Sequence, residues 1–254
     1  MNRTKQKGFL LNPFRFGGIP PSADAYRDLM ISLGPAGYWR LDETSGTTCA
    51  DSSGNGRNAS YFVDASTITS SGLLSASDNR GLMLPSQSIN LKSGFEVPLP
   101  ITTETPWTIA ALVRPDGANS GFDNGVIAQL GYVDGSGSPN VPEIGALDSG
   151  GGKFRLRVMR SGIAQLFTSP EYDYGTRLHI ALTYQSSEIR LYINGVLTNS
   201  YGHTYSGNPG NAKFGHAVFP GTTNHYPFFG KMDEVALFSS VLTDAQIAAL
   251  YAAS

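Results

Sequence analysis

Apolar and polar residues alternate with a period of two in several segments of the chain, which is the pattern of strands that bury one face of a sheet. Residues 153–158 read Lys-Phe-Arg-Leu-Arg-Val, so their apolar side chains share one face and their basic side chains the other. Residues 188–193 read Glu-Ile-Arg-Leu-Tyr-Ile, which predicts one buried face and one that meets water or a ligand. The pattern predicts strands over residues 38–42, 58–63, 82–84, 88–92, 107–114, 125–131, 142–147, 154–159, 163–168, 177–184, 188–193, 196–201, 212–218 and 228–238.

One connection between these strands has a clear turn signature. Asn194-Gly195 separates the strand patterns of residues 188–193 and 196–201. This dipeptide accepts positive φ at both central positions of a type I′ turn. We therefore predict a tight hairpin here.

Helical periodicity occurs near each end of the chain. Residues 22–33 begin with Ser22 as a helix cap, place apolar side chains at helical spacing and stop at Gly34-Pro35. Residues 243–246 read Thr-Asp-Ala-Gln, a capping box, and are followed by apolar residues on one helical face. The sequence predicts a connector helix within residues 22–35 and a short terminal helix, both packed on a sheet.

Residues 1–21 follow neither period, and a continuous element is interrupted at Pro13, Gly17, Gly18, Pro20 and Pro21. The segment is nevertheless too apolar for an ordinary disordered tail, and residues 1–16 carry four basic side chains and no acid. We interpret residues 1–21 as an extended docking arm. Its candidate partner-docking residues are Phe9, Leu10, Leu11, Phe14, Arg15 and Phe16.

Composition agrees with many short strands joined by turns, because 30 Gly and 15 Pro accompany only 15% charged residues. The formal net charge is −2 and the pI about 6.1, which argues against nucleic acid as a partner. No apolar run approaches the ~20 residues of a membrane span, so we expect no membrane insertion. Cys49 is the single cysteine, which excludes an internal disulfide. The short apolar run at the N-terminus is broken by Asn12 and Pro13, so no signal peptide is expected.

Four groups of residues carry a family resemblance. They are residues 37–48 (GYWRLDETSGTT) with 51–56 (DSSGNG), 107–115 (WTIAALVRP), 179–184 (HIALTY) with 190–196 (RLYINGV), and 229–238 (FGKMDEVALF). In order and spacing they resemble the laminin G-like jelly roll of the concanavalin A-like lectin and glucanase superfamily, over residues 36–254. Arg177-Leu178 departs from the pattern, since the family more often has a tryptophan before the position of His179.

The resemblance implies an all-β fold, a two-sheet antiparallel jelly-roll sandwich over residues 36–254. The arm and the two short helices complete the expected organisation. In the family, the concave face and the surrounding loops often bind glycans, sometimes with calcium. The same sandwich serves lectins, hydrolases, adhesion modules and spacers, so the fold alone does not give the function.

A catalytic residue set is not visible. Retaining glycosidases need two carboxyl groups about 5 Å apart, and the nearest approach is Glu171 with Asp173, in a segment that we interpret as a loop after Pro170. The sequence has no Gly-x-Ser-x-Gly nucleophile motif, no phosphate loop and no His-Glu-x-x-His zinc helix. We therefore expect a non-enzyme, and a glycan-degrading hydrolase is the alternative.

No cofactor is required, but a structural Ca²⁺ has candidate ligands. Residues 51–56 form a turn rich in the oxygen ligands that calcium selects. The resemblance places this turn near the strand that carries Asp233, which gives Asp51, Asn55 and Asp233 as candidate ligands. The alternative is that Asp51 and Asn55 make turn hydrogen bonds and Asp233 caps a strand end.

Aromatic side chains, amides and histidines are frequent between residues 201 and 229. Sugar rings stack on aromatic faces, so Tyr201, Tyr205, His225 and Tyr226 are candidate glycan-binding residues. A long surface loop would have the same composition. Trp39 and Trp107 lie in strand patterns, and we expect both in the core instead.

These observations favour a virion-associated protein, either a capsid decoration or a tail component of a bacteriophage. Such a protein would be made in the host cytoplasm, would dock on other virion proteins through residues 1–21, and would display the sandwich toward cell-surface glycans. A stand-alone carbohydrate-binding or adhesion module is the main alternative. A surface with low charge and many Tyr and Phe residues also allows a homo-oligomer.

Overall fold

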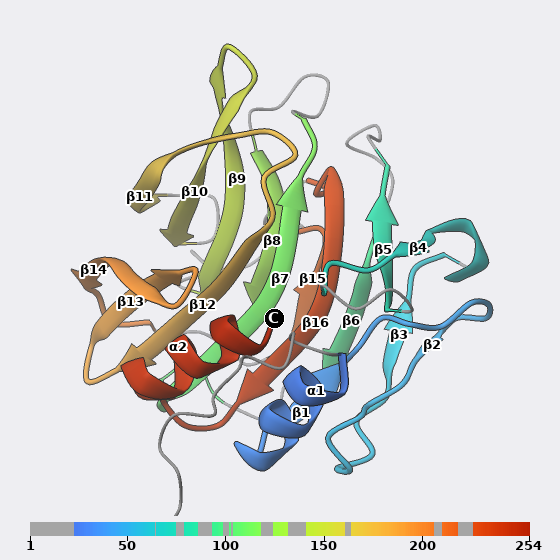
Figure 1. Cartoon of the computed structure of the whole chain (residues 1–254). Coiled ribbons are helices and arrows are strands. Elements are labelled where there is room, and N and C mark those ends of the chain that lie inside the picture. The colour runs from blue at the N-terminus through green and yellow to red at the C-terminus, as the bar shows by residue number, and fades with distance from the viewer. Residues whose placement is uncertain are drawn as a thin grey trace, which may run out of the picture.

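The computed structural model describes residues 23–63, 65–74, 79–85, 93–98, 102, 104–117, 124–131, 141–160, 164–205, 210–217 and 226–254. In these ranges two antiparallel sheets pack face to face, and two short helices lie outside one of them (Figure 1). The predicted all-β sandwich is confirmed. The docking arm, residues 1–21, lies outside the described residues.

The strands form two sheets, which we name sheet A and sheet B. Sheet A has the order β14 (Val196–Gly202), β13 (Glu188–Ile193), β12 (Leu178–Gln185), β7 (Trp107–Pro115), β16 (Gly230–Phe238), β5 (Arg80–Leu84) and β4 (Thr69–Ser71), with β1 (Gly37–Trp39) paired to β16. Sheet B has the order β11 (Ala164–Asp173), β10 (Lys153–Arg160), β9 (Pro142–Gly150), β8 (Asn124–Leu130), β15 (Asn211–Phe214), β6 (Phe95–Pro98), β3 (Ala59–Tyr61) and β2 (Thr48–Cys49). A 3₁₀ turn, η1, spans Ala65–Thr67.

The main core fills the space between the sheets and consists of the apolar side chains that point inward from each sheet. Trp39 and Trp107 both belong to it with no exposed surface, as predicted. The Trp39 ring lies 5.8 Å from the Phe95 ring and 5.9 Å from the Phe214 ring, centroid to centroid, so it joins β1 of sheet A to two strands of sheet B. Large buried side chains of this kind each contribute about 1.5–3 kcal/mol to folding.

A second apolar layer covers the outer face of sheet A. Helices α1 (Ala23–Ser32) and α2 (Asp244–Ala253) lie side by side across β7, β12 and β16 (Figure 1). Tyr26 and Met30 of α1 and Ile247 and Leu250 of α2 are fully buried there. Sheet A is therefore buried on both faces under the helices, which explains why β7 and β12 are apolar almost throughout.

Both predicted helices are confirmed, α1 at Ala23–Ser32 and α2 with its capping box. In that box the Thr243 hydroxyl accepts from the Gln246 main-chain N–H, and the Gln246 side chain accepts from the Thr243 N–H. The two contacts satisfy main-chain groups that helical hydrogen bonds leave open.

The predicted hairpin is confirmed, because Asn194 and Gly195 have φ of 51° and 78°. Several other expectations need correction. Residues 95–98 form the unpredicted strand β6, whereas the predicted strand 88–92 lies outside the described residues. Residues 171–173, interpreted as a loop, continue β11, because they pair with β10. Tyr192, expected to meet water or a ligand, is 2% exposed because α2 covers it.

No described helix combines the length and the apolar character that crossing a membrane requires. Cys49 is a buried free thiol in β2.

Candidate functional site

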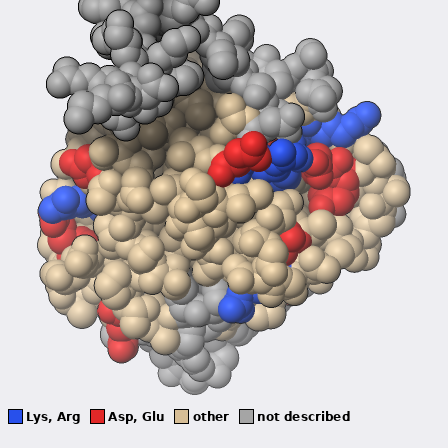
Figure 2. Space-filling model, turned by 60° about the horizontal axis from the view of Figure 1, so that its bottom comes forward, with Lys and Arg blue, Asp and Glu red and all other residues tan. Residues whose placement is uncertain are grey.

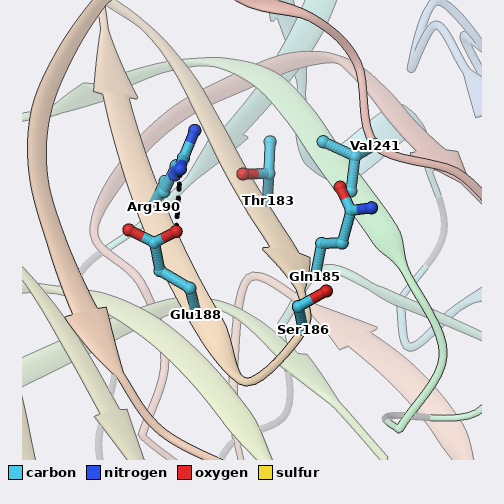
Figure 3. A pocket seen from close by; sticks show the side chains of 6 residues that line it. All are labelled: Thr183, Gln185, Ser186, Glu188, Arg190 and Val241. Carbon is cyan, nitrogen blue, oxygen red and sulfur yellow. Dashed lines mark hydrogen bonds and ion pairs between the residues drawn. The ribbon is translucent and has the colours of Figure 1, made fainter.

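An open pocket of about 260 Å³ lies on the outer face of sheet A, beside the turn between β12 and β13 (Figure 3). Its walls come from these two strands, from their connecting turn and from the segment that precedes α2. The lining residues are Thr183, Gln185, Ser186, Glu188, Arg190 and Val241.

Strand register brings the pocket residues together. Thr183 pairs with Arg190 and Gln185 pairs with Glu188 across the hairpin. Because side chains alternate between the faces of a sheet, these four side chains all point away from the main core. The two-residue turn at Ser186-Ser187 closes this end of the pocket, and Val241 supplies an apolar wall.

Glu188 and Arg190 form an ion pair inside the pocket, with 2.8 Å between Arg190 Nη2 and Glu188 Oε2 (Figure 3). The Arg190 hydrogen bond lowers the pKa of Glu188, and the Glu188 hydrogen bond raises that of Arg190. Both groups are therefore charged at neutral pH. Their side chains are 38% and 43% exposed, so the pair contributes little to stability and mainly fixes two binding groups in place.

The pocket offers both donors and acceptors to a ligand. The hydroxyls of Thr183 and Ser186 and the amide of Gln185 can do both, whereas Glu188 accepts and Arg190 donates. A sugar presents the complementary set of hydroxyl groups and an apolar ring face that suits Val241. Glu188 is the one carboxylate among the lining residues, whereas glycoside hydrolysis ordinarily uses two.

A second polar arrangement crosses the outer face of sheet B. Glu96, Lys213, Gln129 and Glu143 are successive neighbours on β6, β15, β8 and β9. Gln129 Nε2 donates to Glu143 Oε2 over 3.2 Å, and burial raises the pKa of Glu143 to about 8.

A raised pKa is a property of a general acid, but the spacing of the two acids does not provide a catalytic pair. Glu96 and Glu143 lie three strand spacings apart, or about 14 Å at ~4.8 Å per strand. Glycosidases hold their two carboxyl groups about 5–9.5 Å apart. We therefore interpret this row as buried polar packing.

Residues 87–248 match the family described as the Concanavalin A-like lectin/glucanases superfamily. The chain belongs to this superfamily. No curated protein matches the sequence.

Solved structures share the superfamily fold at low sequence identity. Trypanosoma rangeli sialidase in complex with sialic acid has a TM-score of 0.59 and 13% identity, over 90% of this chain and 37% of the sialidase. Domain 4 of a GH43 extracellular arabinanase from Geobacillus stearothermophilus, in complex with arabinotriose, has a TM-score of 0.53 and 18% identity, over 85% of this chain and 97% of that domain. The botulinum neurotoxin type G receptor-binding domain has a TM-score of 0.52 and 15% identity, over 86% of this chain and 51% of that domain. This chain therefore spans little more than a third of the sialidase.

The aromatic residues predicted to bind glycans do not form one site in this lectin-like sandwich. Tyr205 has no exposed surface and packs against Trp107 and Tyr184, so it presents no face to a sugar, and its assignment is corrected. Tyr201 is 46% exposed at the edge strand β14. Tyr226 is half-buried and hydrogen-bonds through its main chain to Ala217 and Val126. His225 lies outside the described residues.

The candidate calcium ligands have other partners. Asp51 Oδ1 accepts main-chain N–H groups from Tyr38 and Ser53, and Oδ2 accepts that of Arg57. The Asn55 amide donates to the Pro35 and Ala36 carbonyls, at 2.9 and 3.3 Å. The geometry of this turn favours the hydrogen-bonding interpretation over the metal.

Asp233 lies in a separate buried cluster on β16. Its Oδ2 accepts the Leu73 N–H over 2.7 Å, and the next residue, Glu234, hydrogen-bonds the Tyr38 hydroxyl and pairs with Arg40. Burial, together with the charge of Glu234, raises the pKa of Asp233. Among the described residues, no three His, Cys, Asp or Glu side chains gather as a metal site.

Glu171 and Asp173, the acids of the hydrolase alternative, are both held in cross-strand ion pairs on β10 and β11. Glu171 Oε1 lies 2.8 Å from Arg155 Nη2, and Asp173 Oδ1 lies 2.8 Å from Lys153 Nζ. Each acid is therefore ion-paired with a basic side chain on an exposed sheet surface.

The sequence analysis missed the pocket. A usable signal exists, because only residues 185–187 separate the predicted strands 177–184 and 188–193, and so short a connection favours an antiparallel hairpin. That hairpin sets Glu188 and Arg190 on the face opposite Ile189 and Leu191. The contribution of Val241 has no local signal, because it comes from a distant segment.

The predicted partner-docking residues of the arm, Phe9 to Phe16, lie outside the described residues.

Proposed function

We propose that this protein is a non-catalytic carbohydrate-binding protein that holds a sugar unit in the pocket on sheet A. The observation that carries the proposal is the set of five polar side chains around an open, preformed pocket, two of them fixed by the Glu188–Arg190 ion pair. The volume, about 260 Å³, is slightly smaller than the ~300–1,000 Å³ of drug-sized sites and suits one sugar ring. The arabinotriose complex of the arabinanase domain gives support by analogy of fold.

The surface charge agrees with a ligand of this kind. On the face shown in Figure 2, most of the described surface is uncharged, and the acidic and basic groups are small and mostly adjacent. No wide basic area appears on that face to attract a polyanion. Specificity would then come from hydrogen bonds and shape.

Glycan-array screening followed by calorimetry tests the proposal. Arg190→Ala and Thr183→Val should each weaken binding of the best glycan at least fivefold, because each removes a group that the pocket presents. Arg155→Ala is the matched control, since Arg155 forms a similar exposed ion pair with Glu171 on sheet B. Absence of glycan binding by the wild-type protein, or equal weakening by Arg155→Ala, would contradict the proposal.

The non-catalytic part of the proposal has its own test. The pocket contains one carboxylate, and Glu96 and Glu143 on sheet B are about 14 Å apart by strand spacing. Incubation with the bound glycans should therefore release no shorter products. Product formation that disappears in Glu171→Gln would support the hydrolase alternative.

We propose further that residues 1–21 anchor the sandwich to other proteins of a virion, as a capsid decoration or a tail component. The support is the arm's sequence, which combines six apolar side chains with four basic ones before the first acid of the chain, Asp24. Deleting residues 2–18 should abolish retention on assembled particles while leaving the sandwich folded. Unchanged incorporation would contradict the anchoring role.

A further inference from the structure

Two consecutive hairpin turns in sheet A, one at each end of β13, share positive φ at both central residues but have different residues there. In the β13–β14 turn, Asn194 and Gly195 have φ of 51° and 78°. In the β12–β13 turn, Ser186 and Ser187 have φ of 51° and 61°. Each turn joins its strands with two residues.

The left-handed conformation favours glycine and asparagine at such positions. Glycine has no Cβ to approach the following carbonyl oxygen, and asparagine offsets that approach through local side-chain hydrogen bonds, so two serines leave this turn strained. The chain relieves the strain in one turn and retains it in the other. Strain of this kind concentrates at binding sites, where the side chain has a task that the relaxed residue cannot perform.

The two serines have different surroundings. The Ser187 hydroxyl accepts from Thr204 Oγ1 over 3.0 Å, and the Ser187 carbonyl accepts the His203 N–H over 2.8 Å. Ser187 is thus tied to the segment that follows β14. Ser186 lines the pocket beside Gln185, with its hydroxyl outside the core (Figure 3). Of the two strained residues, Ser186 is therefore the one that lines the pocket.

The charges around Ser186 indicate which sugars fit. Glu188 and Arg190 neutralise each other at 2.8 Å, so the pocket has no spare cationic charge to receive an acidic sugar. The Glu188 carboxylate would repel a second carboxylate placed beside it. A neutral sugar unit instead pairs its hydroxyls with the Glu188 oxygens and with the hydroxyls of Ser186 and Thr183.

We propose that Ser186 is a specificity-determining ligand contact and that the pocket selects neutral over acidic sugar units. This inference rests on the proposed carbohydrate-binding function. It assigns the β12–β13 turn to recognition rather than to folding alone.

A pair of glycine variants separates the two roles. Ser186→Gly removes the hydroxyl and the strain, whereas Ser187→Gly relieves strain and keeps the Ser186 hydroxyl. Calorimetry with the best neutral oligosaccharide from the array should show about fivefold weaker binding for Ser186→Gly, the loss expected for one hydrogen bond. Ser187→Gly should stay within twofold of the wild-type protein. Ser186→Ala, which keeps the backbone preference of a non-glycine residue, should match Ser186→Gly in binding.

The outcomes distinguish this inference from the proposed function. If the wild-type protein binds neutral oligosaccharides and both Ser186 variants bind equally well, the contact is overturned while carbohydrate binding stands. Preference for sialylated or uronic acid-containing oligosaccharides overturns the selection of neutral sugars. If the wild-type protein binds no oligosaccharide, both proposals fail. Thermal melting of each variant checks that loss of binding is not loss of fold.

Discussion

The Tyr192 hydroxyl donates a 2.7 Å hydrogen bond to Asp244 Oδ1, which joins strand β13 to the first turn of α2. Asp244 also carries negative charge at the helix N-terminus, where the helix dipole favours it. The contact fixes the start of α2 over Tyr192, which packs among the apolar residues of that helix.

Removing this hydroxyl tests its contribution. Tyr192→Phe should lower the free energy of unfolding by about 1–2 kcal/mol, because a part-buried hydrogen bond to a carboxylate is lost. For a chain of this size the melting temperature should fall by about 2–8 °C. Tyr201→Phe, on the exposed edge strand, is the control and should leave the melting temperature unchanged.

Asp51 separates the turn interpretation from the calcium interpretation. Asp51→Ala should destabilise the protein by about 2–3 kcal/mol, because three main-chain N–H groups lose their acceptor. The melting temperature of the wild-type protein should be the same in EDTA and in millimolar Ca²⁺. A clear rise with Ca²⁺ that Asp51→Ala abolishes would instead establish a metal at this turn.

Gly94 is required by both conformation and space. Its φ is 78°, and a Cβ there would lie 1.9 Å from the Phe214 carbonyl oxygen. Gly94→Ala should therefore cost at least ~3 kcal/mol or prevent folding. Gly54→Ala shares the positive φ, 86°, but has open space around the Cβ, so it should cost only about 1 kcal/mol. Chemical denaturation of both variants provides the comparison.

Glu143 should make stability fall as the pH rises. Burial raises its pKa to about 8 in the folded protein, whereas an unfolded glutamate ionises near pH ~4.3. Between these values the folded state holds a proton that the unfolded state has lost, so stability decreases with increasing pH. Glu143→Gln should flatten the decline of melting temperature from pH 5 to 8 without abolishing it, because burial also raises the pKa values of Asp233 and Glu234. Equal slopes in the wild-type protein and in Glu143→Gln would show that Glu143 is not responsible.

His179 should make stability fall as the pH decreases, which is the opposite of the effect of Glu143. It is fully buried beneath the two helices, and burial, followed by the charge of Arg177, lowers its pKa to about 3. An unfolded histidine binds its proton near pH ~6.5, so stability is lost as the pH falls from there toward 3. His179→Leu should reduce this acid sensitivity and raise the melting temperature, because neither ring nitrogen has a hydrogen-bond partner among the described residues. An unaltered acid profile between pH 6.5 and 4 would contradict this account.

Local patterns were reliable where a short stretch of chain decides the structure. The Asn194-Gly195 turn, the Thr243 to Gln246 capping box and the alternation in β10 depend on backbone preferences within a few residues. Strand β6 was not predicted, because Phe95 to Pro98 is too short to show a period. This segment becomes a strand only by pairing with β15 and β3.

Site residues were harder to predict, since composition does not report burial. The segment around Tyr205 has the aromatic content of a binding loop, yet the tyrosine fills space against Trp107 and Tyr184, which come from other strands. Tyr192 alternates onto the outer face as expected, but a helix more than 50 residues later covers it.

The sequence by itself determined most of the strands, the two helices and the Asn194-Gly195 turn, because periodicity and turn chemistry act over distances of a few residues, and the family resemblance implied the two-sheet sandwich. Only the tertiary structure decided where the pocket on sheet A lies. The pocket requires the register of β12 against β13, the position of Val241 before α2, and the coverage of the rest of the sheet by the helices. Each is a contact between segments far apart in the chain, for which a single sequence carries no local signal.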